Sequence, residues 1–115
     1  MKPNPVREKS YVFAVDVVLL SGELAGARQF VLANQVLRAG TSVGANVEEA
    51  LAGQSRRDFR SKMAIASKEA REAHYWLRLL RDGEIVHHER VHDMLQRCEE
   101  LVRLLTAIVK SSGPR

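Results

Sequence analysis

The sequence predicts an all-α protein, an antiparallel up-down-up-down four-helix bundle. Proline, the strongest helix breaker, occurs only at Pro3, Pro5 and Pro114. Apolar residues recur at three- and four-residue steps through most of the chain. Glycines near positions 22–26, 53 and 83 divide it into four segments. We place helices at about residues 6–21, 27–51, 56–81 and 89–111, and we expect one domain over residues 1–115.

The first predicted helix, from about Val6 to Ser21, is apolar around much of its circumference. Between Tyr11 and Leu20 the only charged residue is Asp16. This breadth exceeds one stripe, so more than one face should be buried, either among its bundle partners or in a subunit interface. The valine-rich run would also suit a strand, but the helical context favours a helix.

Small residues line the second and third predicted helices, which a turn at residues 52–54 joins. Gly40 and Gly44 each cost about 1 kcal/mol of helix propensity. They lie one turn apart, so we expect another helix to approach closely there. Ser55 and Asp58 fit a variant of the capping box. The predicted core stripes are Ala33, Val36, Leu37, Gly40, Val43, Gly44, Val47 and Leu51, then Phe59, Met63, Ala66, Ala70, Ala73, Leu77 and Leu80. Small residues should therefore face small residues across this hairpin.

The fourth predicted helix carries the apolar seam of an antiparallel bundle helix. The seam consists of Val91, Met94, Cys98, Leu101, Leu105 and Ile108, flanked by Leu95, Val102 and Val109. Cys98 falls within it, so we interpret this residue as a small buried hydrophobe and not as a nucleophile.

Composition narrows the class of protein further. A chain of 115 residues suits one domain, and 45% hydrophobic residues argue against disorder. The net charge of +4 permits anionic partners. One cysteine excludes an internal disulfide. No apolar run approaches the roughly 20 residues of a membrane span, and the start, Met1 to Pro5, lacks the apolar segment of a signal peptide. We expect a soluble cytoplasmic protein.

The third predicted helix carries a basic face. Residues 55–82 hold eight Lys/Arg against four Asp/Glu, an excess as large as that of the whole chain. For one subunit, the simpler interpretation is a solvated face. A ring of subunits would repeat the stripe and favour binding to RNA or DNA phosphates. No base-reading module is present, so binding should follow shape and charge. The candidate nucleic-acid-binding residues are Arg56, Arg57, Arg60, Lys68, Arg71, Arg78 and Arg81, with His74 on the same face.

A second set of polar residues lies beside the small-residue faces. It consists of Ser42, Asn46 and Glu49 on the second helix and Lys62, Glu69 and Glu72 on the third. We expect cross-helix pairs, for instance Lys62 with Glu49 or Asn46 with Glu69. Such a network would fix helix register or subunit contacts. Acid/base catalysis is the alternative, but no nucleophile or cofactor motif accompanies it.

His88 to His92 matches H-E-x-x-H, the pattern in which two histidines one turn apart bind zinc. The motif lies at the start of the fourth helix, and no third ligand is suitably placed, because Glu99 and Glu100 are about two turns away. We therefore predict no catalytic metal. Adventitious metal binding by His87, His88 and His92 remains open.

The central region also resembles a known family. The residues that carry the resemblance are Ser42 to Ala50, Gln54-Ser55, Asp58-Phe59, Lys62, Lys68 to Glu72 and Tyr75 to Leu77. Together they are similar to the four-helix-bundle proteins encoded in intervening sequences of 23S ribosomal RNA genes. The likeness extends more loosely to Lys9-Ser10-Tyr11 and covers about residues 7–110. It implies an α-helical bundle that forms a homopentamer, with a poorly defined molecular role.

We therefore expect a non-catalytic oligomeric protein without a cofactor. It would bind nucleic acid, either structured RNA or a ribonucleoprotein, through the basic face. The alternative is a protein-interaction adaptor, since related proteins serve as accessory subunits to a reverse transcriptase in diversity-generating elements. A zinc-dependent hydrolase is the remote alternative.

Overall fold

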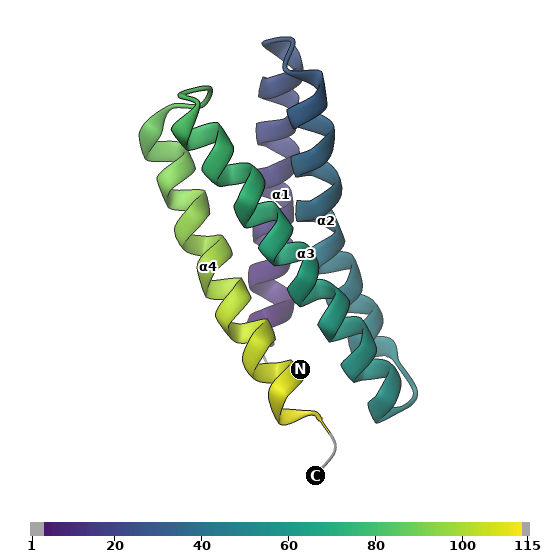
Figure 1. The fold of residues 1–115 in the computed structure, drawn as a ribbon. Coiled ribbons are helices and arrows are strands. Elements are labelled where there is room, and N and C mark those ends of the chain that lie inside the picture. The colour runs from purple at the N-terminus through teal and green to yellow at the C-terminus, as the bar shows by residue number, and fades with distance from the viewer. Residues whose placement is uncertain (1–3, 114–115) are drawn as a thin grey trace.

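The computed structural model describes residues 4–113, and within them four α-helices pack as a bundle (Figure 1). Helix α1 spans Pro5–Gly26, α2 spans Phe30–Ala52, α3 spans Arg56–Asp82 and α4 spans His88–Ser111. Consecutive helices run in opposite directions and are joined by short turns, which confirms the predicted fold class. Residues 1–3 and 114–115, which the predicted domain includes, lie outside the described residues, and with them Pro3 and Pro114.

Two helices begin at a side-chain cap. The Asn4 side chain accepts a hydrogen bond from the Arg7 N–H at 3.1 Å, and Pro5 occupies the first turn of α1. The Ser55 hydroxyl accepts from the Asp58 N–H at 3.0 Å, as predicted. The Ser55 N–H does not donate to the Asp58 carboxylate in the described part of the chain, so only half of the capping box is present.

Helix α1 continues one turn beyond its predicted end at Ser21. The intervening Gly22 costs about 1 kcal/mol of propensity, which is too little to stop a helix whose next turn is buried. Leu24, in that turn, is 3% exposed. The Ser21 hydroxyl also donates to the Ala33 carbonyl of α2 at 3.0 Å. Contacts with the rest of the bundle therefore stabilise the last turn of α1, which ends at Gly26.

The chain then reverses at residues 27–29, where we had predicted the start of the second helix. Arg28 adopts a left-handed conformation with a φ of 64°, which a continuous helix cannot contain. Helix α2 consequently begins at Phe30, three residues later than predicted.

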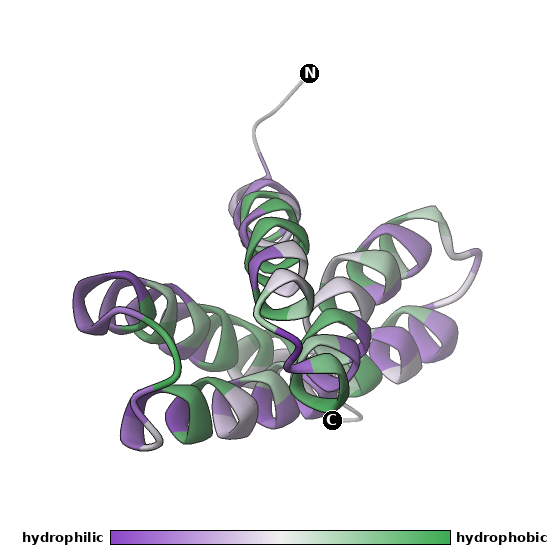
Figure 2. Ribbon diagram, turned by 90° about the horizontal axis from the view of Figure 1, so that it is seen from above, coloured by the Kyte–Doolittle hydropathy of each residue, from purple (hydrophilic) through white to green (hydrophobic). Residues whose placement is uncertain are grey.

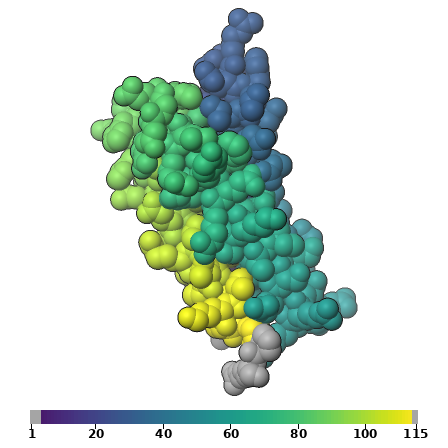
Figure 3. Space-filling model, viewed as in Figure 1, coloured from purple at the N-terminus to yellow at the C-terminus, as the bar shows by residue number. Residues whose placement is uncertain are grey.

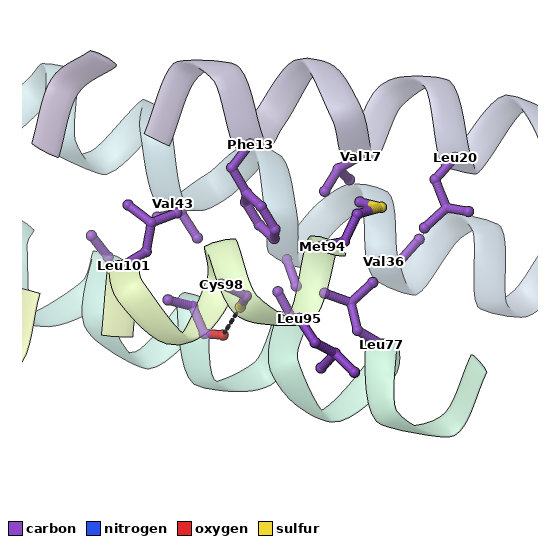
Figure 4. Packing of buried hydrophobic residues seen from close by; sticks show 14 of the residues in the cluster. Phe13, Val17, Leu20, Val36, Val43, Leu77, Met94, Leu95, Cys98 and Leu101 are labelled. Carbon is purple, nitrogen blue, oxygen red and sulfur yellow. Dashed lines mark hydrogen bonds between the residues drawn. The ribbon is translucent and has the colours of Figure 1, made fainter. Parts of the chain in front are cut away.

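Apolar side chains from all four helices meet in one core (Figure 4). Phe13, Val17 and Leu20 of α1 point toward Met94 and the other labelled residues of α4, α2 and α3 (Figure 4). The predicted stripes of α3 and α4 are buried except at Phe59, Val102, Ile108 and Val109, which are half-buried. On α2 the prediction is wrong for Leu51, which is 40% exposed, whereas Ala39 and Ala50 are buried.

The close helix approach at the α2 glycines involves α1 and not α3. A Cβ placed at Gly40 would lie 2.6 Å from Cγ2 of Val17, and one at Gly44 would lie 3.3 Å from the Ser10 carbonyl oxygen. Both contacts belong to α1. Our expectation that these glycines allow close packing between α2 and α3 is therefore wrong. The spacing of small residues shows that one face of α2 can be approached closely, but it does not show which helix packs there.

The packing order leaves one face of α1 uncovered. Helix α1 packs against α2 and, less extensively, α4, and within residues 4–113 its Cα atoms stay more than 8 Å from those of α3. Its outward residues remain apolar, with Tyr11 65% and Leu19 59% exposed. Figure 2 shows hydrophobic residues on more than one side of this helix. The exposed apolar face of α1 consists of Tyr11, Val12, Val15, Val18 and Leu19.

Candidate nucleic-acid interface

The predicted cations of α3 lie on the outer surface of the bundle. Helix α3 is in front in Figure 1, and Figure 3 shows it beside α4 on this face. Arg56, Arg57, Arg60, Lys68, Arg71 and Arg78 are all exposed, and Arg81 is half-buried. Within residues 4–113, only Arg81 has a carboxylate within salt-bridge distance, that of its neighbour Asp82 at 2.8 Å. Among residues 4–113, the other six therefore have no carboxylate that compensates their charge in a direct ion pair.

Several of these guanidinium groups are positioned by uncharged partners. Arg71 donates to the Thr106 hydroxyl at 2.9 Å, and Arg56 donates to the Ser112 carbonyl at 3.4 Å. The Arg78 guanidinium lies 5.6 Å from the centre of the Tyr75 ring, a cation–π contact. Contacts of this kind hold the side chain without neutralising it.

The α3 cations border a groove shared with α4. The groove has a volume of about 390 Å³ and is lined by Arg71, His74, Arg78, Glu99, Val102 and Arg103. Arg103 of α4 is a cation of this surface that the sequence prediction missed. Arg103 lies four residues after Glu99 and three before Thr106, so it shares their face of α4. The sequence alone does not show that this face is turned toward α3.

One carboxylate lies in the groove. Glu99 is bonded to Nε2 of His74 at 3.0 Å. This hydrogen bond, followed by the charges of His74, Arg103 and His92, holds the pKa of the Glu99 carboxyl below its usual range. At the end of α3, the hydrogen bond to Asp82 likewise raises the pKa of Arg81 and lowers that of Asp82. Both carboxylates therefore remain ionised at neutral pH.

The predicted polar network is present in part. Lys62 pairs with Glu49 across the α2–α3 hairpin at 3.3 Å, as expected. Asn46 does not reach Glu69, because its amide donates to the Ser42 carbonyl of its own helix at 2.8 Å. The Ser42 hydroxyl in turn donates to the Arg38 carbonyl at 2.6 Å. These two polar side chains therefore stay within α2.

Arg38, which the sequence prediction did not include, is the centre of the network. It bonds Glu69 at 3.0 Å and also pairs with Glu72. Glu72 accepts from the Trp76 indole N–H at 3.2 Å. Glu69 is only 12% exposed as a side chain, so Arg38 compensates two neighbouring carboxylates at once. Both acidic groups thus serve packing between α2 and α3.

The histidines before and within α4 do not converge on a metal site. His88 and His92 stack with their ring centres 6.3 Å apart. Within residues 4–113, no group of three or more His, Cys, Asp and Glu residues is arranged to hold a metal ion. The open possibility of a three-histidine cluster with His87 is therefore not supported by the geometry.

Cys98 is buried in the seam, as predicted. Its side chain is inaccessible, and the thiol donates to the Ala70 carbonyl of α3 at 3.2 Å (Figure 4). Burial raises the pKa of this thiol to about 12. The neutral thiol is a poor nucleophile, so Cys98 acts as a core residue.

The molecule is thus a four-helix bundle with an apolar outer face on α1 and a basic face on α3 and α4. Among the described residues, no helix has the length and apolarity needed to cross a membrane. Residues 2–107 match the family described as 23S rRNA-intervening sequence protein, and the chain belongs to that family.

A solved structure supports this assignment. The chain is 43% identical to a protein of unknown function from the S23 ribosomal protein family of Bacteroides thetaiotaomicron. The TM-score is 0.87, and the match covers 91% of this chain and 98% of that one. No functionally curated protein is detectably similar to the chain. The comparisons therefore establish the family and the fold, and they assign no function to the chain.

Proposed function

We propose that this protein is a non-catalytic, self-assembling helical bundle that binds nucleic acid, structured RNA or a ribonucleoprotein, through the face of α3 and α4. The observation that carries the proposal is the row of cations on α3, six of which have no carboxylate partner within residues 4–113. Arg103 extends the row onto α4. Such a row suits a polyanion, because each phosphate contact releases counterions.

The position of the row agrees with self-assembly. In the described chain the Cα atoms of α1 stay more than 8 Å from those of α3, and Figure 1 shows α3 in front and α1 behind it. Burial of the apolar face of α1 between subunits would leave the cations of α3 facing outward in every copy. A homopentamer is the assembly that the family resemblance implies. Repetition of a weak phosphate-binding surface in one particle would raise its affinity for a long RNA.

Charge-reversal variants test the binding function. We expect a structured RNA hairpin to bind in a salt-dependent manner, measured by fluorescence anisotropy at two salt concentrations. Arg60→Glu with Arg71→Glu should weaken binding and lower the slope of log K against log salt by about 2. Arg28→Glu is a matched control for the Arg71→Glu single variant, because it makes the same charge change in the exposed α1–α2 turn.

The binding proposal fails if the wild-type protein leaves RNA and duplex DNA unbound at low salt. It also fails if Arg28→Glu weakens binding as much as Arg71→Glu, since the effect would then reflect net charge alone.

Self-assembly needs a separate test. Val15→Asp with Leu19→Asp places two charges on the apolar face of α1, whose side chains at these positions are exposed in one subunit. We expect this variant to be monomeric by light scattering while keeping its helical content. Ile65→Asp, at an exposed apolar position on α3, should leave the assembly unchanged. A wild-type monomer at all concentrations would contradict this part of the proposal.

The same apolar face supports the alternative, an adaptor that docks a protein partner without touching nucleic acid. A groove of about 280 Å³ lies beside it, lined by Glu8, Lys9, Val12, Arg97 and Glu100 of α1 and α4. In that case, nuclease treatment of a lysate would not release the partner, and Val15→Asp with Leu19→Asp would. The RNA-binding proposal predicts instead that nuclease treatment releases the bound material and that Arg60→Glu with Arg71→Glu weakens binding.

A further inference from the structure

The groove between α3 and α4 places a single carboxylate among several cations. Arg71 and Arg78 line it from α3, and Arg103 lines it from α4. The remaining lining groups are His74, Glu99 and the apolar side chain of Val102. Glu99 is thus the only negative group among the described residues that line the groove.

Two arginines of the groove are held by uncharged partners. Arg71 is held by the hydroxyl of Thr106, and Arg78 lies against the Tyr75 ring. Neither contact neutralises the positive charge of the arginine. Three guanidinium-bearing side chains therefore line this groove, and guanidinium groups match phosphate oxygens in both charge and geometry.

Glu99 is the anionic group already present in this groove. It accepts a hydrogen bond from His74 of α3 at 3.0 Å. The other charged groups that face it are Arg81 of α3 and His92 and Arg103 of α4. Helices α1 and α2 contribute no described residue to the lining. In the absence of another anion, this carboxylate balances part of the positive charge of the groove.

We propose that the α3–α4 groove is a phosphodiester subsite, in which Glu99 is a built-in competitor that a phosphate oxygen displaces as the acceptor for His74. The subsite rests on the proposed function, because the phosphodiester is that of the bound nucleic acid. A phosphate beside Glu99 brings two negative charges together, and protonation of His74 offsets their repulsion. Binding is therefore coupled to proton uptake at His74.

This coupling fixes the sign of the pH dependence. A bound phosphate stabilises the imidazolium form of His74, so affinity rises as the pH falls. One added charge about 4 Å from a phosphate in water changes affinity by about fivefold. We expect wild-type RNA binding to be about that much tighter at pH 5.5 than at pH 8. His74→Gln should remove most of this change, whereas His88→Gln, on an exposed position of α4, should preserve it.

Two adjacent glutamates provide the matched variants. Glu99→Gln and Glu100→Gln change the net charge equally, but Glu100 pairs with Lys9 of α1 at 3.0 Å, away from this groove. Glu99→Gln removes the competitor, so RNA affinity at pH 8 should increase about fivefold. Glu100→Gln should leave it unchanged. Equal affinities of the two variants, or a pH dependence that survives in His74→Gln, would overturn the subsite even if RNA binding itself is confirmed.

Inorganic phosphate tests the subsite without nucleic acid. The NMR resonance of the His74 ring is followed through a pH titration with and without phosphate, and the His88 ring serves as the reference. We expect phosphate to move the titration midpoint of His74 upward and that of His88 much less. Equal responses would count against the subsite. A selective response at His74 in a protein that does not bind RNA would support an anion site while refuting the proposed function.

Discussion

Replacement of Gly40 by alanine should destabilise the bundle, although alanine is the better helix former. The added Cβ would lie 2.6 Å from Cγ2 and 2.7 Å from Cγ1 of Val17 in α1. Val17 is fully buried. A β-branched side chain in a helix has one strongly preferred rotamer, so Val17 cannot turn both methyl groups away. Relief requires α1 and α2 to move apart.

The magnitude follows from two opposing terms. Alanine gains about 1 kcal/mol of helix propensity over glycine, whereas overpacking a core costs about 1–3 kcal/mol. The contacts are short, so we expect the upper part of that range and a net loss of about 1–2 kcal/mol. Gly22→Ala is the matched control. Its Cβ would meet nothing within 4 Å, so it should gain about 1 kcal/mol.

Urea unfolding followed by far-UV circular dichroism measures the difference. All variants must be compared at one protein concentration, because assembly adds to apparent stability. Val17→Ala in the Gly40→Ala background should cost less than in the wild type, since it removes the clashing methyl groups. If Gly40→Ala proved as stable as Gly22→Ala, the close α1–α2 contact would be refuted.

Two further predictions concern buried groups. Cys98 should not react with a thiol reagent at pH 8 in the native protein and should react fully in urea, because its raised pKa keeps the thiol neutral and its burial excludes the reagent. Its contribution to stability is complete below the unfolded thiol's pKa and is lost as the pH rises toward 12, which alkaline unfolding curves would reveal. Arg38→Ala should lower the free energy of unfolding by about 1–3 kcal/mol, because it leaves Glu69 and Glu72 uncompensated. Lys62→Ala, at the more exposed pair with Glu49, should cost below about 1 kcal/mol, and equal losses would refute the central role of Arg38.

The four helices could be predicted because each repeats its apolar residues at helical spacing and no proline interrupts them. The end of α1 could not. Glycine at position 22 is a weak breaker, and the helix continues because Ser21 reaches the Ala33 carbonyl. That bond depends on the position of α2, which local sequence does not contain. The start of α2 could not be predicted for the same reason, because the left-handed conformation of Arg28 forms part of the turn between α1 and α2.

In the candidate site, too, some residues could be predicted from the sequence and others could not. The α3 cations could be predicted because they share one face of one helix. Arg103 and Arg38 could not, because each acquires its role from a neighbouring helix. Arg103 joins the α3 groove from α4, and Arg38 meets two glutamates across the hairpin. The Lys62–Glu49 pair could be predicted from the sequence because both residues lie near the short α2–α3 turn. There the turn nearly fixes which residues of the two helices face each other.

The apolar face of α1 and the cations of α3 make different contributions to the proposed function, and variants can separate them. Charges at Val15 and Leu19 would dissociate subunits without touching the groove, so each monomer should keep its pH dependence while losing affinity for long RNA. Glu99→Gln would change the affinity of each groove without changing subunit number. Because the Cα atoms of α1 and α3 stay more than 8 Å apart in the described chain, the two effects on log K should add. Strong non-additivity would mean that assembly reshapes the groove itself, and the phosphate site would then belong to the oligomer and not to the single bundle.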